Sequence, residues 1–336
     1  MEHPDYTTAA DAWIGIDVSK DILDVCLLQS NDKTTSGEFT NDRKGHGQLL
    51  KWAKRFSKGS KSIHFCMEAT GAYHNACAMY LAEDDQKVSV VNPYKIHHWM
   101  IATGEGNKTD MVDGRAISAY CRAVKPPLWR AASPEMRELT ALVRHLDNLK
   151  EHSTQQKNRL QQPGLPSTVI KSLQKLLTQI ETEIDAVEKL IKEHINNNPN
   201  LKRDRDLLVS IPGVAETTAA KILAELPDVE QFASAKAAAK YAGLSPSEYE
   251  SGTSVRKRTR LYRAGKRKLK KALYMPAMSA IRFNEPIQRL YDRLIDKGHK
   301  GASALAAAMR KLIMIAYGVL KSQTPFRPDF AATRNA

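Results

Sequence analysis

The chain has 336 residues, of which 42% are hydrophobic, and its formal net charge is +14. This length is too great for one small domain and suits two or three globular modules with ordinary hydrophobic cores. The charge is uneven: residues 1–125 hold 15 basic and 16 acidic side chains, so the whole positive excess lies after residue 125. Such asymmetry predicts a polyanionic partner, and nucleic acid is favoured over an anionic membrane.

The sequence carries no sign of secretion or of a membrane span. The four cysteines have no CxxC spacing, and "MEHPDYTTAADAW" lacks the basic and apolar regions of a signal peptide. The apolar segment "SALAAAMRKLIMIAYGVL" is interrupted by Arg310 and Lys311, which favours a buried helix. We therefore expect a reduced, cytoplasmic protein without a membrane partner.

Residues 12–125 alternate between strand-like and helix-like patterns. "AWIGIDV" and "ILDVCLL" are joined by the turn "SKD", which predicts an antiparallel hairpin, and "TTSGEFT" can supply a third strand. A helical segment, the strand "SIHFCMEA", a second helix and the strand "KVSVVN" follow. This order predicts an α/β domain with a mixed sheet.

Residues 134–199 predict a helical linker of coiled-coil type. Apolar residues recur every three or four positions from Leu139 to Leu149, and resume after "QQPGLPS". The second series has the 3.5-residue repeat of a coiled-coil seam and comprises Leu173, Leu177, Ile180, Ile184, Val187 and Ile191. We expect this seam to join subunits of a homo-oligomer, a dimer or a tetramer. The alternative is a helical hairpin packed on its own chain. A third module, residues 201–327, is expected to be all-helical.

Four carboxylates are candidates for one site in the first module. Asp17 and Glu68 each end an apolar strand, and Asp110 and Asp113 lie three apart on a predicted helix, which places them on one face. Such a cluster needs a countercharge, and hard oxygen ligands suit one or two Mg²⁺ ions that promote phosphoryl transfer. A single carboxylate of this kind is more often a solvated turn or cap, and Asp21 and Asp24 are assigned to the hairpin turn.

The motifs "IGIDVSK", "MEATG" and "KTDMVDGRA", followed by a basic helical module, resemble the DEDD transposases of bacterial insertion sequences. The resemblance continues in "LLVSIPGVAETTAAKILAEL", "FASAKAAAKYAGLSPSEYESG", "LKKALYMPAM" and "AMRKLIMIAYGVLK", across nearly the whole chain. It implies an N-terminal domain similar to the junction-resolvase version of the ribonuclease H fold, and it implies that Asp17, Glu68, Asp110 and Asp113 are the acidic site residues. Gly114 departs from the small helix-forming residue usual in the family.

The segment "IPGVAETTAAKIL" is a second candidate. A Pro-Gly turn before a helix N-terminus exposes N–H groups to which a DNA phosphate can bind, as in helix-hairpin-helix motifs. Ala215 stands where such motifs commonly have a second glycine. A plain helical turn is therefore almost equally expected, and no phosphate ligand is assigned.

A Ser-Gly pair at Ser251 opens the most basic stretch of the chain. Between Ser251 and Ala272 there are ten basic residues and no carboxylate. We expect them to bind nucleic acid, because so many cations gain from the counterion release that accompanies it. They are Arg256, Lys257, Arg258, Arg260, Arg263, Lys266, Arg267, Lys268, Lys270 and Lys271.

The serine has two interpretations. An isolated Ser-Gly pair is most often only a turn. In the resembling family, however, the serine at this point is the recombinase nucleophile, and only Ser251 matches it. Cations around a hydroxyl would stabilise the charge that develops when it attacks a phosphodiester.

The resemblance thus implies a transposase that uses Mg²⁺ to cleave and exchange donor and target DNA through a phosphoserine, guided by a structured bridge RNA. One alternative is a junction-resolving or ribonuclease H-type endonuclease in which water is the nucleophile. Another is a nucleic-acid-binding protein without catalytic activity.

Overall fold

The structure is a computed structural model. It describes residues 10–57, 62–69, 71, 73–104, 110–251, 255–262 and 265–328, with the backbone alone at 110–113, 247–251 and 255–260. The chain divides into two compact units, Met1–Ala131 and Ala132–Ala336. The expected α/β unit followed by a mostly helical remainder is confirmed.

The first unit is built on a five-stranded mixed sheet. Its strands are β1 (Ala12–Val18), β2 (Ile22–Gln29), β3 (Thr34–Thr40), β4 (Ile63–Glu68) and β5 (Lys87–Val91), in the spatial order β3-β2-β1-β4-β5. β2 is antiparallel to both β1 and β3, as the predicted hairpin requires. β4 and β5 run parallel to β1, so the carboxyl ends of β1 and β4 lie at the same edge.

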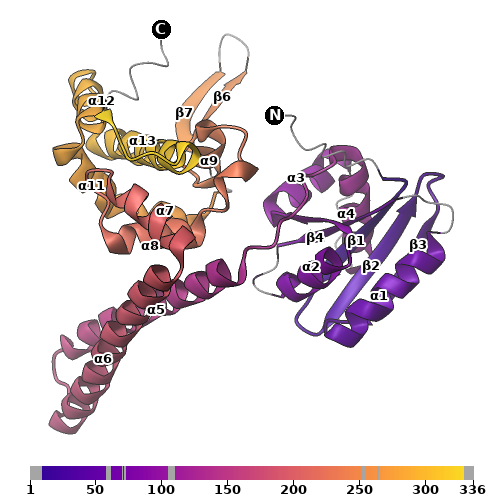
Figure 1. The fold of residues 1–336 in the computed structure, drawn as a ribbon, viewed down its shortest axis with the longest axis horizontal. Coiled ribbons are helices and arrows are strands. Elements are labelled where there is room, and N and C mark those ends of the chain that lie inside the picture. Colours follow the sequence, from indigo (N-terminus) through magenta and orange to yellow (C-terminus); the bar gives the residue numbers. More distant parts are fainter. Residues whose placement is uncertain are drawn as a thin grey trace. The chain divides into compact units, whose positions relative to one another are not determined.

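Helices cover both faces of this sheet (Figure 1). α1 (Arg43–Phe56) and α2 (His74–Glu83) pack on one face, where their apolar residues join Ile14 and Ile16 in one core. α3 (Pro93–Thr103) and α4 (Asp110–Val124) contribute to a second core on the other face. The predicted elements did not include α3, although Asn92 caps it and Pro93 occupies its first turn, a common helix start.

The second unit begins with two long helices, α5 (Pro134–Leu160) and α6 (Ser167–Asn197). They pack antiparallel: Lys150 Nζ lies 2.6 Å from Glu188 Oε1, and Lys157 Nζ lies 2.9 Å from Glu181 Oε1. Leu173, Val187 and Ile191 are buried within the chain. The seam of α6 packs against α5, as in the hairpin alternative.

The rest of the second unit shares a core with this helical hairpin. It comprises α7 (Pro199–Val209), α8 (Glu216–Glu225), the 3-10 turn Val229–Gln231, α9 (Ala235–Tyr241), α10 (Arg267–Ala272), α11 (Tyr274–Phe283), α12 (Glu285–Asp296) and α13 (Gly301–Ser322). Among the described residues, α13 is the one helix long and apolar enough to cross a membrane, and half of that stretch is buried in the unit. Its Leu312 and Ile313 are fully buried, as expected of a core helix.

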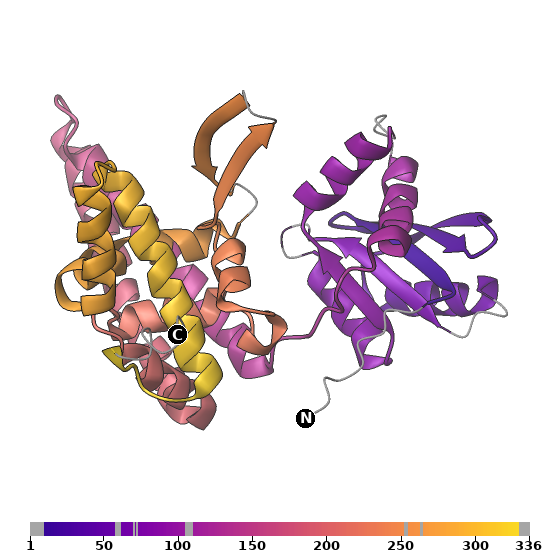
Figure 2. The same cartoon turned by 90° about the horizontal axis from the view of Figure 1, so that it is seen from above.

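A β-hairpin interrupts the helices, which corrects the expectation of an all-helical third module. β6 (Pro246–Ser251) pairs antiparallel with β7 (Val255–Leu261) and projects from the helical body of this unit (Figure 2). Tyr249, Val255 and Thr259 favour extended backbone, and successive cations repel one another less along a strand than on a helix face. The many lysines and arginines of the segment mask this strand propensity in the sequence.

Candidate active site

Asp17 and Glu68 lie on neighbouring strands at the same edge of the sheet. The parallel register of β1 and β4 runs to Ile16 opposite Met67, and each acid follows one residue later. Both residues are half-buried. The β-structure therefore brings these two predicted site residues side by side.

Both acids belong to the sheet face that α4 covers. Side chains alternate along a strand, so Asp17 shares a face with Trp13, and Glu68 shares one with Cys66. Trp13 and Cys66 pack in the same core as Ile117 of α4.

Gly15 lets α4 approach this face closely. A Cβ on Gly15 would lie 2.0 Å from the carbonyl oxygen of Gly114 and 2.4 Å from the backbone nitrogen of Ser118. Further along α4, the Arg122 guanidinium lies 5.8 Å from the centroid of the Trp13 ring. Gly114 of α4 thus lies next to Gly15, and Arg122 lies next to Trp13, so α4 runs in the direction opposite to β1. The N-terminal turn of α4 therefore lies toward Asp17.

That turn begins with Asp110, and Asp113 immediately precedes Gly114. The backbone thus carries both residues toward the edge that holds Asp17 and Glu68, while their side chains lie outside the described part of the chain. Among the side chains that are described, no group of three or more His, Cys, Asp or Glu could hold a metal ion. Asp17 and Glu68 are hard oxygen donors and fit a divalent cation such as Mg²⁺.

Ser251 lies at the far end of the β6–β7 hairpin. It pairs with Val255, whereas Pro246 pairs with Leu261 at the foot, where the hairpin joins the helices. The backbones of Arg256, Lys257, Arg258 and Arg260 lie on β7. The side chains of Ser251 and of these four residues, and Arg263 altogether, fall outside the described residues.

The five remaining cations, Lys266 and four residues of α10, differ in their surroundings. Arg267 and Lys268 are exposed, and Lys270 is half-buried. Lys271 Nζ lies 2.7 Å from Glu151 Oε1, and this hydrogen bond raises the pKa of Lys271. Lys266 Nζ lies 3.8 Å from Glu225 Oε2. Lys266 and Lys271 therefore already have carboxylate partners within the chain.

The Pro-Gly turn before α8 packs against α11. Gly213 has a φ of +98°, and a Cβ there would lie 2.8 Å from the backbone nitrogen of Ala280. Nδ2 of Asn284 lies 3.5 Å from the carbonyl oxygen of Pro212. These contacts show that the glycine allows the turn to pack against α11. They agree with the interpretation of the motif as a plain helical turn.

Sequence reasoning missed two features of these sites. The need for glycine at position 15 arises from the close approach of α4, which no local pattern reveals. The ion-pair partner of Lys266 belongs to a helix that is far from it in the sequence. Nothing in the basic run itself indicates that Lys266 is half-buried.

Comparisons with known proteins cover both units. Residues 205–292 match the model described as the Transposase IS116/IS110/IS902 family, and residues 14–163 match an IS110-type model described as Transposase. The chain is 32% identical over 317 residues to the pilin gene-inverting proteins of Moraxella lacunata and Moraxella bovis, which covers 94% of this chain and 97% of each relative. It is 30% identical over 161 residues to an uncharacterized insertion element IS110 protein of Streptomyces coelicolor, covering 48% of this chain and 38% of that protein.

Proposed function

Because the chain belongs to the transposase family of IS116, IS110 and IS902, and is thus a DNA-recombining enzyme, we propose that it exchanges DNA strands with Ser251 as the nucleophile. The observation that carries this proposal is the meeting of Asp17 and Glu68 at one sheet edge, toward which α4 carries Asp110 and Asp113. This arrangement supports a ribonuclease H-like acidic site.

In the proposed reaction, the Oγ–P bond to Ser251 forms as the bond between phosphorus and one deoxyribose oxygen breaks. The serine loses a proton and the released sugar hydroxyl gains one, so the phosphodiester energy is kept for rejoining. The four acids would hold Mg²⁺, which supplies positive charge to the transferred phosphate. Arg267 and Lys268 are exposed cations suited to binding a nucleic-acid backbone.

The family supports DNA as the substrate of the reaction. We propose that the chain acts in the cytoplasm as a homo-oligomer on donor and target DNA, guided by a structured bridge RNA that binds the basic surface after Ser251. The name of the Moraxella relatives says that they invert a pilin gene. Inversion and transposition both require cleavage and rejoining of strands, which a phosphoserine intermediate allows.

Separate substitution of the acids and the serine tests this proposal. Asp17→Asn and Asp113→Asn keep the side-chain shape but remove a charged ligand, so strand cleavage should collapse while the chain stays folded. Ser251→Ala should also abolish cleavage. Asp21→Asn, in the turn after β1, should have little effect. The readout is cleavage of labelled donor and target DNA with the copurifying RNA and added Mg²⁺.

Two results would contradict the proposal. Full activity of Asp17→Asn in the presence of a chelator would remove the acidic site from the reaction. Cleavage by Ser251→Ala together with loss of cleavage by Asp17→Asn would favour the hydrolase that uses water.

A further inference from the structure

The foot of the β6–β7 hairpin is fixed to the helical body by its backbone. The backbone N–H of Tyr262 donates to the carbonyl of Ser245 at 2.9 Å, and that of Lys266 donates to Tyr241 at 2.7 Å. Gly243 has a φ of +71°, and a Cβ on Gly265 would lie 2.1 Å from the Cα of Gly243. The two chain segments that enter and leave the hairpin are therefore held against each other and against α9.

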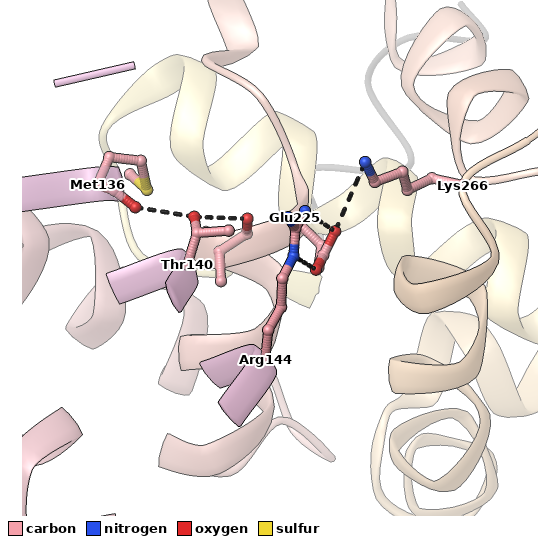
Figure 3. Close-up of polar contacts among 6 residues, drawn as sticks. Met136, Thr140, Arg144, Glu225 and Lys266 are labelled. Atoms are coloured by element: carbon pink, nitrogen blue, oxygen red, sulfur yellow. Dashed lines mark hydrogen bonds and ion pairs between the residues drawn. The ribbon is translucent and has the colours of Figure 1, made fainter. Parts of the chain in front are cut away.

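The side chain of Lys266 continues from this foot into a half-buried ionic cluster around Glu225 (Figure 3). Glu225, the last residue of α8, is 4% exposed. Arg144 of α5 donates to it twice, from Nε to Oε1 at 2.8 Å and from Nη2 to Oε2 at 3.2 Å. Lys266 Nζ approaches Oε2 of the same carboxylate at 3.8 Å.

The surroundings of Lys266 differ from those of a phosphate ligand at the surface. Burial lowers its pKa, against the opposing attraction of Glu225, and the nearby Arg144 and Lys268 lower it further. Lys266 is half-buried, with its ammonium group beside a buried carboxylate, whereas Arg267 and Lys268 next to it in sequence are exposed.

We propose that Lys266 is a positioning residue, which through Glu225 and Arg144 sets the direction of the hairpin and so the location of Ser251. This inference rests on the proposed function of Ser251. β6 spans five residue steps, about 17 Å of extended chain, so a tilt of about 10° at the foot would move Ser251 by about 3 Å. Misplacement of a reacting group by about 1 Å can lower a rate about a hundredfold.

The test compares Lys266→Met with Lys221→Met. Lys221 on α8 is a matched control because it is also half-buried and its Nζ lies 2.5 Å from Asp147 of α5, an ion pair that does not touch the hairpin. The rate of strand cleavage is measured at saturating DNA, well below the melting temperature of each variant. DNA affinity is measured at several salt concentrations, with Lys268→Met as an example of a lost phosphate contact.

Lys266→Met should cleave at least about tenfold more slowly than Lys221→Met. Its plot of log affinity against log salt should keep the slope of the parent, whereas Lys268→Met should lower that slope by about 1. Lys266→Arg should recover part of the rate, because it restores a cation that can reach Glu225. Glu225→Gln should slow cleavage as Lys266→Met does, because the foot loses the charge that both cations contact.

The inference is wrong if Lys266→Met cleaves as fast as Lys221→Met, or if Lys266→Arg recovers none of the rate. A salt slope lowered by about 1 in Lys266→Met would instead make Lys266 a phosphate ligand. Ser251→Ala is assayed alongside: if it still cleaves DNA, the proposed nucleophile fails, while the comparison of Lys266→Met with Lys221→Met still shows whether the foot controls the rate.

Discussion

Gly15 shows how one residue can set the distance between a helix and the sheet that it covers. The backbone of α4 passes so close to β1 that any side chain at position 15 would collide with Gly114 and Ser118. Gly114 differs, since a Cβ there would meet its neighbours at 3.4 to 3.6 Å, which is ordinary contact. The close approach of α4 to β1 therefore requires glycine at position 15 and does not require it at position 114.

Substitution of these two glycines should give opposite results. Gly15→Ala should push α4 from the sheet, lower the free energy of unfolding by about 3 kcal/mol and abolish metal-dependent cleavage. Gly114→Ala should raise the stability by up to about 1 kcal/mol, because alanine favours a helix. Urea unfolding and the cleavage assay measure both effects. A Gly15→Ala protein with the stability and activity of the parent would show that α4 does not need this close approach.

His64 makes the first unit sensitive to acid. The residue is fully buried, its Nε2 lies 2.8 Å from the Ser89 hydroxyl, and burial, reinforced by Lys87, lowers its pKa to about 4. The unfolded chain takes up this proton near pH 6.5 and the folded chain only near pH 4, so acid favours unfolding between these values. His64 should therefore contribute a loss of about 3 kcal/mol in the free energy of unfolding between pH 7 and pH 4.

The measurement is urea unfolding of the parent and of His64→Gln at both pH values. The variant keeps a polar partner for Ser89 but cannot take up a proton, so its stability should fall by less. An equal loss in both proteins would assign the acid sensitivity to other groups.

At the scale of elements, the α5–α6 hairpin stabilises its own chain. Val187 is 2% exposed and faces α5, whereas Leu190 is 49% exposed. Val187→Asp should lower the free energy of unfolding by about 3 kcal/mol or more, because it buries an unpaired charge, and Leu190→Asp should change it little. Thermal unfolding measures the difference. If Val187→Asp kept its melting temperature but light scattering showed smaller assemblies, the seam would be a contact between subunits after all.

The mixed sheet could be predicted because its strands alternate with helices and are bounded by clear turn residues. The elements that were missed depend on context. α3 begins at an Asn-Pro pair that also fits the end of a strand, and the many basic residues of the β6–β7 hairpin conceal its strand propensity. The heptad repeat of α6 predicted an apolar seam correctly, but such a repeat fits α5 of the same chain as well as another subunit.

The candidate site was predictable to the extent that motifs and strand ends mark it. Asp17 and Glu68 could be paired from sequence, because the carboxyl ends of parallel strands share one edge. Gly15, Glu225 and Arg144 could not, because their importance comes from contacts between distant segments.

At the scale of the whole molecule, the excess of positive charge lies after residue 125 and should dominate nucleic-acid binding. If six or more phosphates are neutralised, affinity should fall by about a thousandfold or more between 50 and 200 mM salt. Filter binding or anisotropy with unrelated DNA sequences measures this loss. A flat salt response would point to a different surface.

The most direct test of the central claim is peptide mapping of protein joined covalently to labelled DNA. We predict an adduct at Ser251 that forms during cleavage and is absent from Ser251→Ala, while Ser251→Ala binds nucleic acid almost as tightly as the parent, since one hydroxyl is a small part of the interface. An adduct at Ser245, Ser247 or Ser254, or efficient cleavage by Ser251→Ala without any adduct, would contradict the account.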